Sequence, residues 1–176
     1  MTGERPLILI VEDDEDLARL NARLLKRQGY AVLIASSAAE ARETVKKGSP
    51  DLFVLDVALP DGDGLSLCSE FRELSDAPVL FLTGKSSLDD KVSGLDAGGD
   101  YYLTKPHDNK EFVAVVQRLL RRAERTREII AEASVITKGP LTLKLNEKKV
   151  YVNGCDAELT SKEYSVFLLL VENEGS

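Results

Sequence analysis

Short apolar runs of strand length recur five times along the first 105 residues of the chain. They lie at 6–11, 30–35, 52–56, 78–82 and 100–104. Runs that are apolar on both faces are typical of parallel strands that helices cover above and below. The pattern therefore predicts five buried parallel strands.

The stretches between these runs carry apolar residues at helical spacing. Helices are expected from Leu17 to Gly29, from Ser36 or Ser37 to Lys47, over 65–74, from Ser86 or Ser87 to Ala97, and from Asn109 past Arg122. Five strands that alternate with five helices predict an α/β fold, a doubly wound parallel sheet with right-handed crossovers.

Polar side chains follow four of the five predicted strands. An acidic cluster that includes Glu12 and Asp13 follows the first strand, and Asp56 ends the third. Thr83 and Lys105 follow the fourth and the fifth. In a five-stranded sheet of order 2-1-3-4-5, these strand ends line one edge, where the sites of open α/β sheets lie. We therefore expect the four loops to converge on Asp56.

Several neighbouring carboxylates stay ionised at low cost only when a cation lies among them. Carboxylate and carbonyl oxygens suit Mg²⁺. With that ion bound, an ionised Asp56 would attack a phosphoryl group in line. Lys105 would supply a cation to the phosphoryl oxygens, and Thr83 would supply a hydroxyl donor.

Composition restricts the class of protein. The 176 residues are 43% hydrophobic and 30% charged, as in ordinary globular proteins, and no apolar run approaches the length that spans a bilayer. The net charge of −7 argues against a nonspecific nucleic-acid binder. Two distant cysteines suggest neither a disulfide framework nor a metal knuckle, so a cytoplasmic location is expected.

The motifs together resemble those of the receiver domain of a two-component response regulator. They are Glu12-Asp13, Leu55-Asp56 with the segment 60–64 (PDGDG), Leu82-Thr83, and the segment 100–106 (DYYLTKP), in this order and at suitable spacing over residues 7–122. The resemblance implies that Asp56 accepts a phosphoryl group from a histidine kinase and that the receiver itself catalyses the transfer.

The resemblance also implies roles for the other residues of the motifs. Asp13 would bind Mg²⁺ directly together with Asp56, Glu12 would act through water, and the carbonyl of Ala58 would complete the protein ligands. Thr83 would be the switch hydroxyl, Lys105 the phosphoryl-binding lysine, and Tyr102 the aromatic residue whose rotation reports phosphorylation.

Some positions depart from the pattern of the family. Gly84 stands where Ala is usual, and His107 stands where Phe is usual. Tyr101 and Val115 replace an Asp and an Arg that pair across the family's dimer, which is formed by the fourth helix, fifth strand and fifth helix. The dimer is still expected, and its interface residues would be Lys91, Asp100, Tyr101, Glu111, Val115 and Arg118.

The remaining residues predict a second, smaller segment. Residues 121–133 are charged and read as a helical extension or as a flexible tether, with a linker over 134–140. Two alternating strands, an Asn153-Gly154 turn and a capping box at 160–163 follow. This order resembles the start of a winged-helix effector domain. Because the DNA-reading helix would follow Ser176, no DNA-contacting residue is assigned, and the predicted domains are 1–122, 123–140 and 141–176.

These inferences predict a phosphorylation-switched transcriptional regulator with a sensor histidine kinase, promoter DNA and a second copy of the chain as partners. No separate turnover and no membrane contact are expected. A Mg²⁺-dependent phosphohydrolase is the enzyme alternative, but such sites carry a second Asp two residues after the nucleophile, where this chain has Ala58. A receiver-like interaction module that never takes phosphate is the third alternative.

Overall fold

The computed structural model describes residues 5–84 and 98–172, and its chain divides into two compact units, Met1–Ala123 and Glu124–Ser176. Each unit is described by itself below. The predicted helix from Ser86 or Ser87 to Ala97 lies outside the described residues. No helix of the described part is long and apolar enough to cross a membrane.

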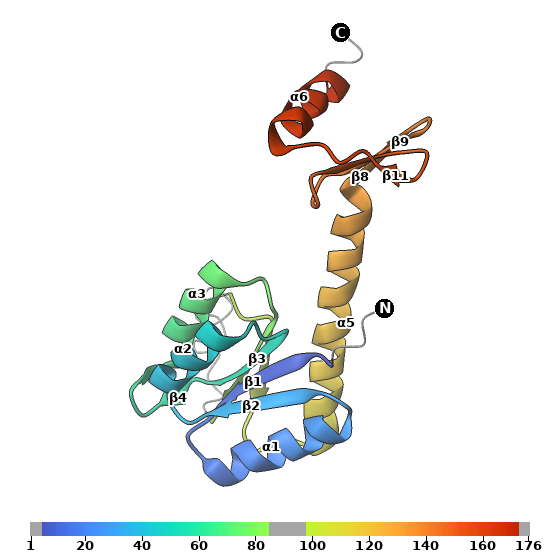
Figure 1. Cartoon of the computed structure of the whole chain (residues 1–176). Helices are drawn as coiled ribbons and strands as arrows, with labels where there is room; N and C mark the ends of the chain where they lie inside the picture. The colour runs from blue at the N-terminus through green and yellow to red at the C-terminus, as the bar shows by residue number, and fades with distance from the viewer. Residues whose placement is uncertain (1–4, 85–97, 173–176) are drawn as a thin grey trace. The chain divides into compact units, whose positions relative to one another are not determined.

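The first unit is built on a five-stranded parallel sheet (Figure 1). Its strands are β1 (Leu7–Val11), β2 (Ala31–Ala35), β3 (Leu52–Asp56), β6 (Val79–Thr83) and β7 (Tyr101–Thr104). They lie in the order β2-β1-β3-β6-β7, which confirms the predicted order 2-1-3-4-5. All five residues of β3 and of β6 are buried, as expected for central strands with helices on both faces.

Helices cover both faces of this sheet and produce two apolar cores. Helices α2 (Ala38–Lys47) and α3 (Gly64–Leu74) pack on one face, where Phe53 and Phe71 stack. Helices α1 (Glu15–Arg27) and α5 (Asn109–Ala133) supply the second core, which includes Phe112. The sheet is therefore held between two helical layers, and its strand ends are fixed from both sides.

Acidic side chains and one serine cap the helices that follow the carboxyl ends of the strands. Asp14 accepts hydrogen bonds from the first turn of α1, and Asp108 accepts them from the first turn of α5. Ser37 caps α2, and Asp63 caps α3. Such caps satisfy amide groups that the helix leaves without partners, and so they fix where each loop ends.

The second unit has a four-stranded antiparallel sheet in the order β11-β10-β9-β8 and the helix α6 (Ser161–Glu172). The strands are β8 (Val135–Lys138), β9 (Leu141–Lys144), β10 (Lys149–Val152) and β11 (Cys155–Asp156). Leu143, Val150 and Tyr164 form its buried core. The predicted capping box is present, since Thr160 and Glu163 bond to each other's backbone amides.

The predicted linker over 134–140 is wrong for most of its length. Residues 135–138 pair with β9 as an antiparallel strand, and a left-handed Gly139 makes the turn between the two strands. The run Val135-Ile136-Thr137 is β-branched and suits a pleated strand. The preceding helix continues to Ala133, in line with the helical alternative for 121–133.

Candidate functional site

The ends of four strands bring the predicted polar residues to one edge of the parallel sheet. Glu12 directly follows β1, and Asp56 is the last residue of β3. Thr83 ends β6, and Lys105 directly follows β7. Glu12 is 1%, Asp56 6% and Thr83 2% exposed. The edge therefore holds ionisable groups in surroundings that exclude most water.

Lys105 connects two of the acidic side chains. Its Nζ lies 2.6 Å from Oδ2 of Asp56 and 2.5 Å from Oε2 of Glu12. Burial alone would lower the pKa of Lys105, but its hydrogen bonds with both carboxylates outweigh burial and raise that pKa above its ordinary value. The ammonium group is thus held in its charged form beside Asp56.

Burial destabilises the charged form of Glu12, and Lys105 compensates for this only in part. Desolvation raises the pKa of Glu12 above its ordinary value, and the hydrogen bond and charge of Lys105 offset this only in part. The nearby charge of Asp56 raises the pKa further. A buried carboxylate beside a second one is stabilised by a further cation.

Glu12, Asp13 and Asp56 can together hold a metal ion. Each offers one carboxylate oxygen, and these oxygens lie within 4.8 Å of one another. Asp13 is exposed, whereas the other two are buried, so the group has one open side. Three hard oxygen donors with access to water fit Mg²⁺, which keeps some of its own waters when bound. The residues present therefore fit the ion that the sequence predicts.

The loop after β3 approaches the Asp56 backbone too closely for most residues. The amide of Gly64 donates to the carbonyl of Val57, and a Cβ on Gly64 would lie 2.0 Å from the carbonyl oxygen of Asp56. Asp61 in the same loop accepts hydrogen bonds from the amides of Ala38 and Ala39 at the start of α2. These amides lower the pKa of Asp61. No role was predicted for Gly64 or Asp61, although the segment PDGDG contains both.

The backbone around Ala58 and Thr83 closes the site. The Ala58 amide donates to Oδ1 of Asp56 over 3.1 Å, and the role of the Ala58 carbonyl as a metal ligand stays a prediction. The Lys105 amide donates to the Thr83 carbonyl over 2.7 Å. The Lys105-Pro106 peptide bond is cis. Two neighbouring strands are thereby tied together where their functional side chains emerge.

Tyr102 lies next to the site, on the face of the sheet that α3 covers. Its ring stacks on Phe81 with centroids 4.8 Å apart, and it packs against the core on that face. Burial raises the pKa of its phenol. The buried hydroxyl has no hydrogen-bond partner in the described part of the chain. The switch role of Tyr102 stays a prediction.

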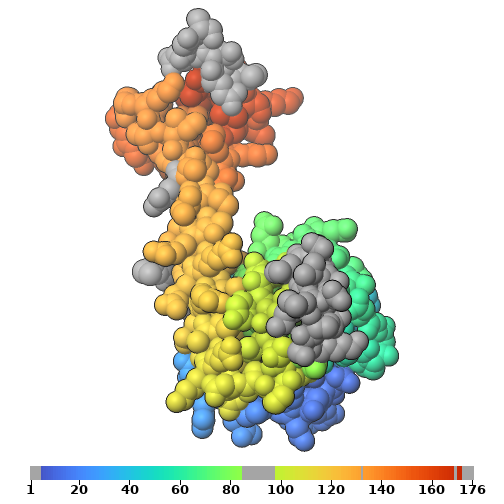
Figure 2. Space-filling model, turned by 180° about the vertical axis from the view of Figure 1, so that it is seen from behind, coloured from blue at the N-terminus to red at the C-terminus, as the bar shows by residue number. Residues whose placement is uncertain are grey.

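The predicted dimer residues mostly have partners within their own chain. Asp100 pairs with Arg72 of α3, and Arg118 lies 4.8 Å from the ring centroid of Tyr101. Val115 is 5% exposed and belongs to the core, so its assignment to an exposed face is corrected. Lys91 lies outside the described residues. Figure 2 shows this side of the molecule, with α5 in yellow next to the yellow-green segment of β7.

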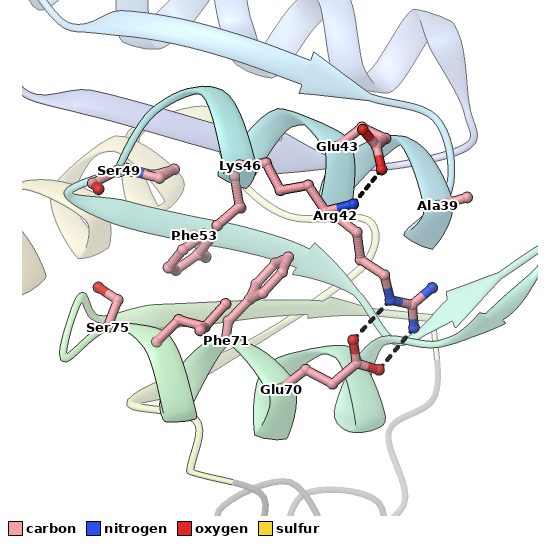
Figure 3. A pocket seen from close by; sticks show the side chains of 12 residues that line it. Ala39, Arg42, Glu43, Lys46, Ser49, Phe53, Glu70, Phe71 and Ser75 are labelled. Carbon is pink, nitrogen blue, oxygen red and sulfur yellow. Dashed lines mark hydrogen bonds and ion pairs between the residues drawn. The ribbon is translucent and has the colours of Figure 1, made fainter.

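A separate pocket of about 610 Å³ lies between α2 and α3 (Figure 3). Arg42 and Glu70 form a bidentate ion pair across it, in which both N–O distances are 2.7 Å. Phe53 and Phe71 lie deeper and are 1% and 2% exposed, so the pocket presents little aromatic surface. None of the predicted site residues lines it, and the candidate site is therefore the acidic edge around Asp56.

Comparison with known proteins places this geometry in a family. The model of the response regulator receiver domain matches residues 8–117. Transcriptional regulatory protein PrrA of Mycobacterium tuberculosis is 39% identical over 170 residues, which cover 96% of this chain and 72% of that protein. Regulatory protein VanR of Enterococcus faecium is 36% identical over 170 residues, which cover 96% of this chain and 74% of VanR.

Solved structures agree with the sequence comparisons. A putative response regulator from Chloroflexus aurantiacus superposes with a TM-score of 0.64 at 36% identity and covers 67% of this chain and 99% of its own. DrrB of Thermotoga maritima, an OmpR/PhoB homologue, superposes with a TM-score of 0.62 at 26% identity and covers 98% of this chain and 75% of its own. This chain therefore belongs to the response regulator family and carries its receiver domain.

Proposed function

We propose that the chain is a phosphorylation-switched transcriptional regulator that takes a phosphoryl group on Asp56 from a sensor histidine kinase. The observation that carries this proposal is the contact between the Asp56 carboxylate and the Lys105 ammonium at a buried strand end, beside two further acids. A phosphoacceptor needs an ionised nucleophile and a cation for the incoming oxygens, and this arrangement supplies both.

The residues act on the transfer in separate ways. A carboxylate oxygen of Asp56 attacks phosphorus while the bond from phosphorus to the kinase imidazole breaks, and the imidazole leaves with the electron pair of that bond. Lys105 moves its ammonium from the carboxylate to the phosphoryl oxygens, and the Thr83 hydroxyl donates to another of them. Asp13, Asp56, the Ala58 carbonyl and, through water, Glu12 would hold Mg²⁺, which would supply positive charge next to the phosphoryl oxygens. The receiver thus catalyses its own phosphorylation, without separate turnover.

The expected output is control of transcription in the cytoplasm. Phosphorylation would draw Thr83 and Tyr102 toward Asp56 and change the face that includes β7 and α5, where a second copy of the chain would bind. The named relatives PrrA and VanR are regulators, and PrrA is a transcriptional one, which supports promoter DNA as the final partner.

Incubation with acetyl phosphate and Mg²⁺ tests the proposal. We expect one phosphate per chain, found on Asp56 by mass spectrometry, labile to acid and base, and lost when EDTA is present. The variant Asp56→Asn is the control and should stay unmodified. Steady hydrolysis of a phosphomonoester, or phosphate at another residue, would overturn the proposal in favour of a phosphohydrolase or an unrelated modification.

A further inference from the structure

A polar pair, formed by buried Asn21 and half-buried His107, connects α1 with the loop that carries Lys105. Asn21 of α1 is fully buried, and its Oδ1 lies 3.2 Å from Nε2 of His107. The two residues are 86 positions apart in the chain. The imidazole also lies against Phe112, a buried core residue of α5, with ring centroids 5.2 Å apart. An amide and an imidazole thus meet at the margin of an otherwise apolar core.

The hydrogen bond fixes which imidazole nitrogen carries the proton. Amide Oδ1 accepts hydrogen bonds only, so Nε2 of His107 must donate, and in the neutral ring Nδ1 then holds a lone pair. Nδ1 of His107 and Nδ2 of Asn21 are buried and have no partner among the described residues. A proton on Nδ1 would therefore create a buried N–H without an acceptor, which is a costly arrangement.

Burial and the charges around the imidazole together lower the pKa of His107. Burial lowers the pKa of His107, and the positive charge of Lys105 lowers it further. Glu111 and Asp108 at the start of α5 raise it, without reversing the net direction. The group that α1 presents to the ring is the uncharged Asn21 amide. The closed arrangement of the pair therefore favours neutral His107.

Both partners stand close in sequence to functional residues. His107 follows Lys105 by two positions and precedes Asp108, which caps α5. Helix α1 starts at Glu15, directly after its Asp14 cap, and so follows the loop that holds Glu12 and Asp13. The hydrogen bond between Asn21 and His107 therefore connects the loop that carries Lys105 with α1, the helix that follows the acidic loop.

We propose that Asn21 and His107 are a proton-sensitive pair of positioning residues, which hold Lys105 against Asp56 while His107 is neutral and release it when His107 is protonated. The proposal rests on the proposed phosphorylation of Asp56. Protonation at Nδ1 would leave a buried N–H without an acceptor, so the loop that carries Lys105 would have to move to bring this group to water. Acid would then slow the phosphoryl transfer through His107, and comparison with a variant that lacks the imidazole separates this effect from protonation of Glu12, whose pKa is also raised.

The test measures phosphorylation of the whole chain by acetyl phosphate with Mg²⁺, between about pH 5.5 and pH 7.5, with donor saturation curves. In His107→Gln the amide can still donate to Asn21 but does not titrate. The maximal rate of this variant near neutral pH should stay within about twofold of the wild-type rate. The ratio of the wild-type rate to the variant rate should fall at least about threefold toward acid pH. Asn21→Leu removes the acceptor and should lower the maximal rate about fivefold, with little change in the KM for acetyl phosphate.

Two further measurements separate positioning from loss of folding. The double variant Asn21→Leu with His107→Phe restores an apolar contact, and it should regain most of the rate while losing the acid sensitivity of His107. The chain has one histidine, so nuclear magnetic resonance can follow its imidazole directly, and its pKa should lie below the ordinary value in the wild type. Thermal unfolding at neutral pH verifies that each variant is folded.

The outcomes distinguish this proposal from the proposed function. Wild-type protein that takes no phosphate on Asp56 contradicts the function itself. If wild type and His107→Gln both take phosphate on Asp56 and show the same pH profile, the positioning role of the pair is contradicted. The proposed function is then unaffected. An imidazole that titrates at its ordinary pKa in the wild type would also overturn the pair.

Discussion

At the residue scale, the site places a buried carboxylate where burial makes its charge costly. Glu12 is 1% exposed, and desolvation raises its pKa above the ordinary value of 4.5. Lys105 contacts Asp56 as well as Glu12, so its one positive charge is shared between two carboxylates. The folded chain therefore keeps a destabilising charge at a proposed metal-binding position, as functional sites commonly do.

This cost predicts the effect of Glu12→Gln on stability. Because the pKa of Glu12 is raised by folding, there is a pH range above about 4.5 in which Glu12 is protonated in the folded chain and ionised in the unfolded chain. The stability that comes from the neutral form of Glu12 is lost as pH rises through the folded-state pKa. The neutral variant should raise the free energy of unfolding near pH 7.5 by about 1 kcal/mol in urea titrations without divalent ions. It should weaken Mg²⁺ binding about tenfold.

The matched control for this variant is Glu15→Gln. The Glu15 side chain is 72% exposed and pairs with exposed Arg19, so its effect should stay below about 0.5 kcal/mol. A Glu12→Gln protein that is less stable than the wild type at neutral pH would contradict the account of its burial.

Two glycines provide a second test at the residue scale. Gly64→Ala would place its Cβ 2.0 Å from the Asp56 carbonyl oxygen, so the loop behind the phosphoacceptor must shift. We expect a loss of about 3 kcal/mol in urea unfolding and slower phosphorylation. A Cβ at Gly84 meets no atom of the described residues within 4 Å, and Gly84→Ala should be neutral within about 0.5 kcal/mol. Equal effects of the two substitutions would contradict the close approach.

At the element scale, one arginine holds three segments together at the opposite edge of the parallel sheet. Arg72 near the end of α3 donates to the carbonyls of Gly98 and Ala77 and pairs with Asp100. The same Asp100 carboxylate accepts from the Val79 amide at the start of β6. The arginine thus links the end of α3 to the segments before β6 and β7.

Loss of this arginine should cost more than loss of an exposed one. Arg72→Ala removes the hydrogen-bond donor of the Gly98 and Ala77 carbonyls and the cation beside the Asp100 carboxylate. It should lower the free energy of unfolding by about 2 kcal/mol. Arg42→Ala breaks only the ion pair with Glu70, whose side chains are 42% and 46% exposed, and should cost less than about 1 kcal/mol. Urea titration compares them, and a reversed order would refute the structural role of Arg72.

Elements with a local signal were predictable from the sequence. The strand β3 has a continuous apolar run, and Asp108 precedes α5 as a capping residue does, so both were found. Because strand ends meet at one edge, the convergence on Asp56 followed as well. The strand β8 was missed, because four residues between a helix and a turn resemble a linker until β9 is seen to pair with them.

Contacts between distant residues had no such signal. The bond between Asn21 and His107 and the pair of Arg72 with Asp100 depend on how the helices pack on the sheet, which apolar periodicity does not specify. Val115 was assigned to a surface by resemblance, yet its apolar side chain lies in the core. Physical chemistry favours that position, because a valine at a buried helix position contributes apolar area that an arginine cannot.

At the scale of the whole molecule, the proposed output needs a second copy of the chain. Within the described residues, the bonds of Asp100 and Arg118 inside one chain leave Glu111 as the exposed acid of the proposed face. The resemblance to response regulators implies that Lys91 of the second copy is its counterpart.

A charge exchange tests that pairing. Glu111→Lys should weaken dimerisation of the phosphorylated protein about tenfold in sedimentation experiments, because it brings like charges together. The double variant Glu111→Lys with Lys91→Glu should restore dimerisation. Failure of the double variant to recover, with both proteins folded and phosphorylated, would show that these residues do not face each other.

The convergence of four strand ends on Asp56 is tested most directly by a crystal structure with Mg²⁺ and beryllofluoride, which mimics a phosphoryl group. The account predicts beryllium bonded to an Asp56 oxygen, fluorides next to the Lys105 ammonium and the Thr83 hydroxyl, and Mg²⁺ bound by Asp13 and Asp56. Beryllofluoride on another side chain, or Mg²⁺ bound away from these carboxylates, would contradict it.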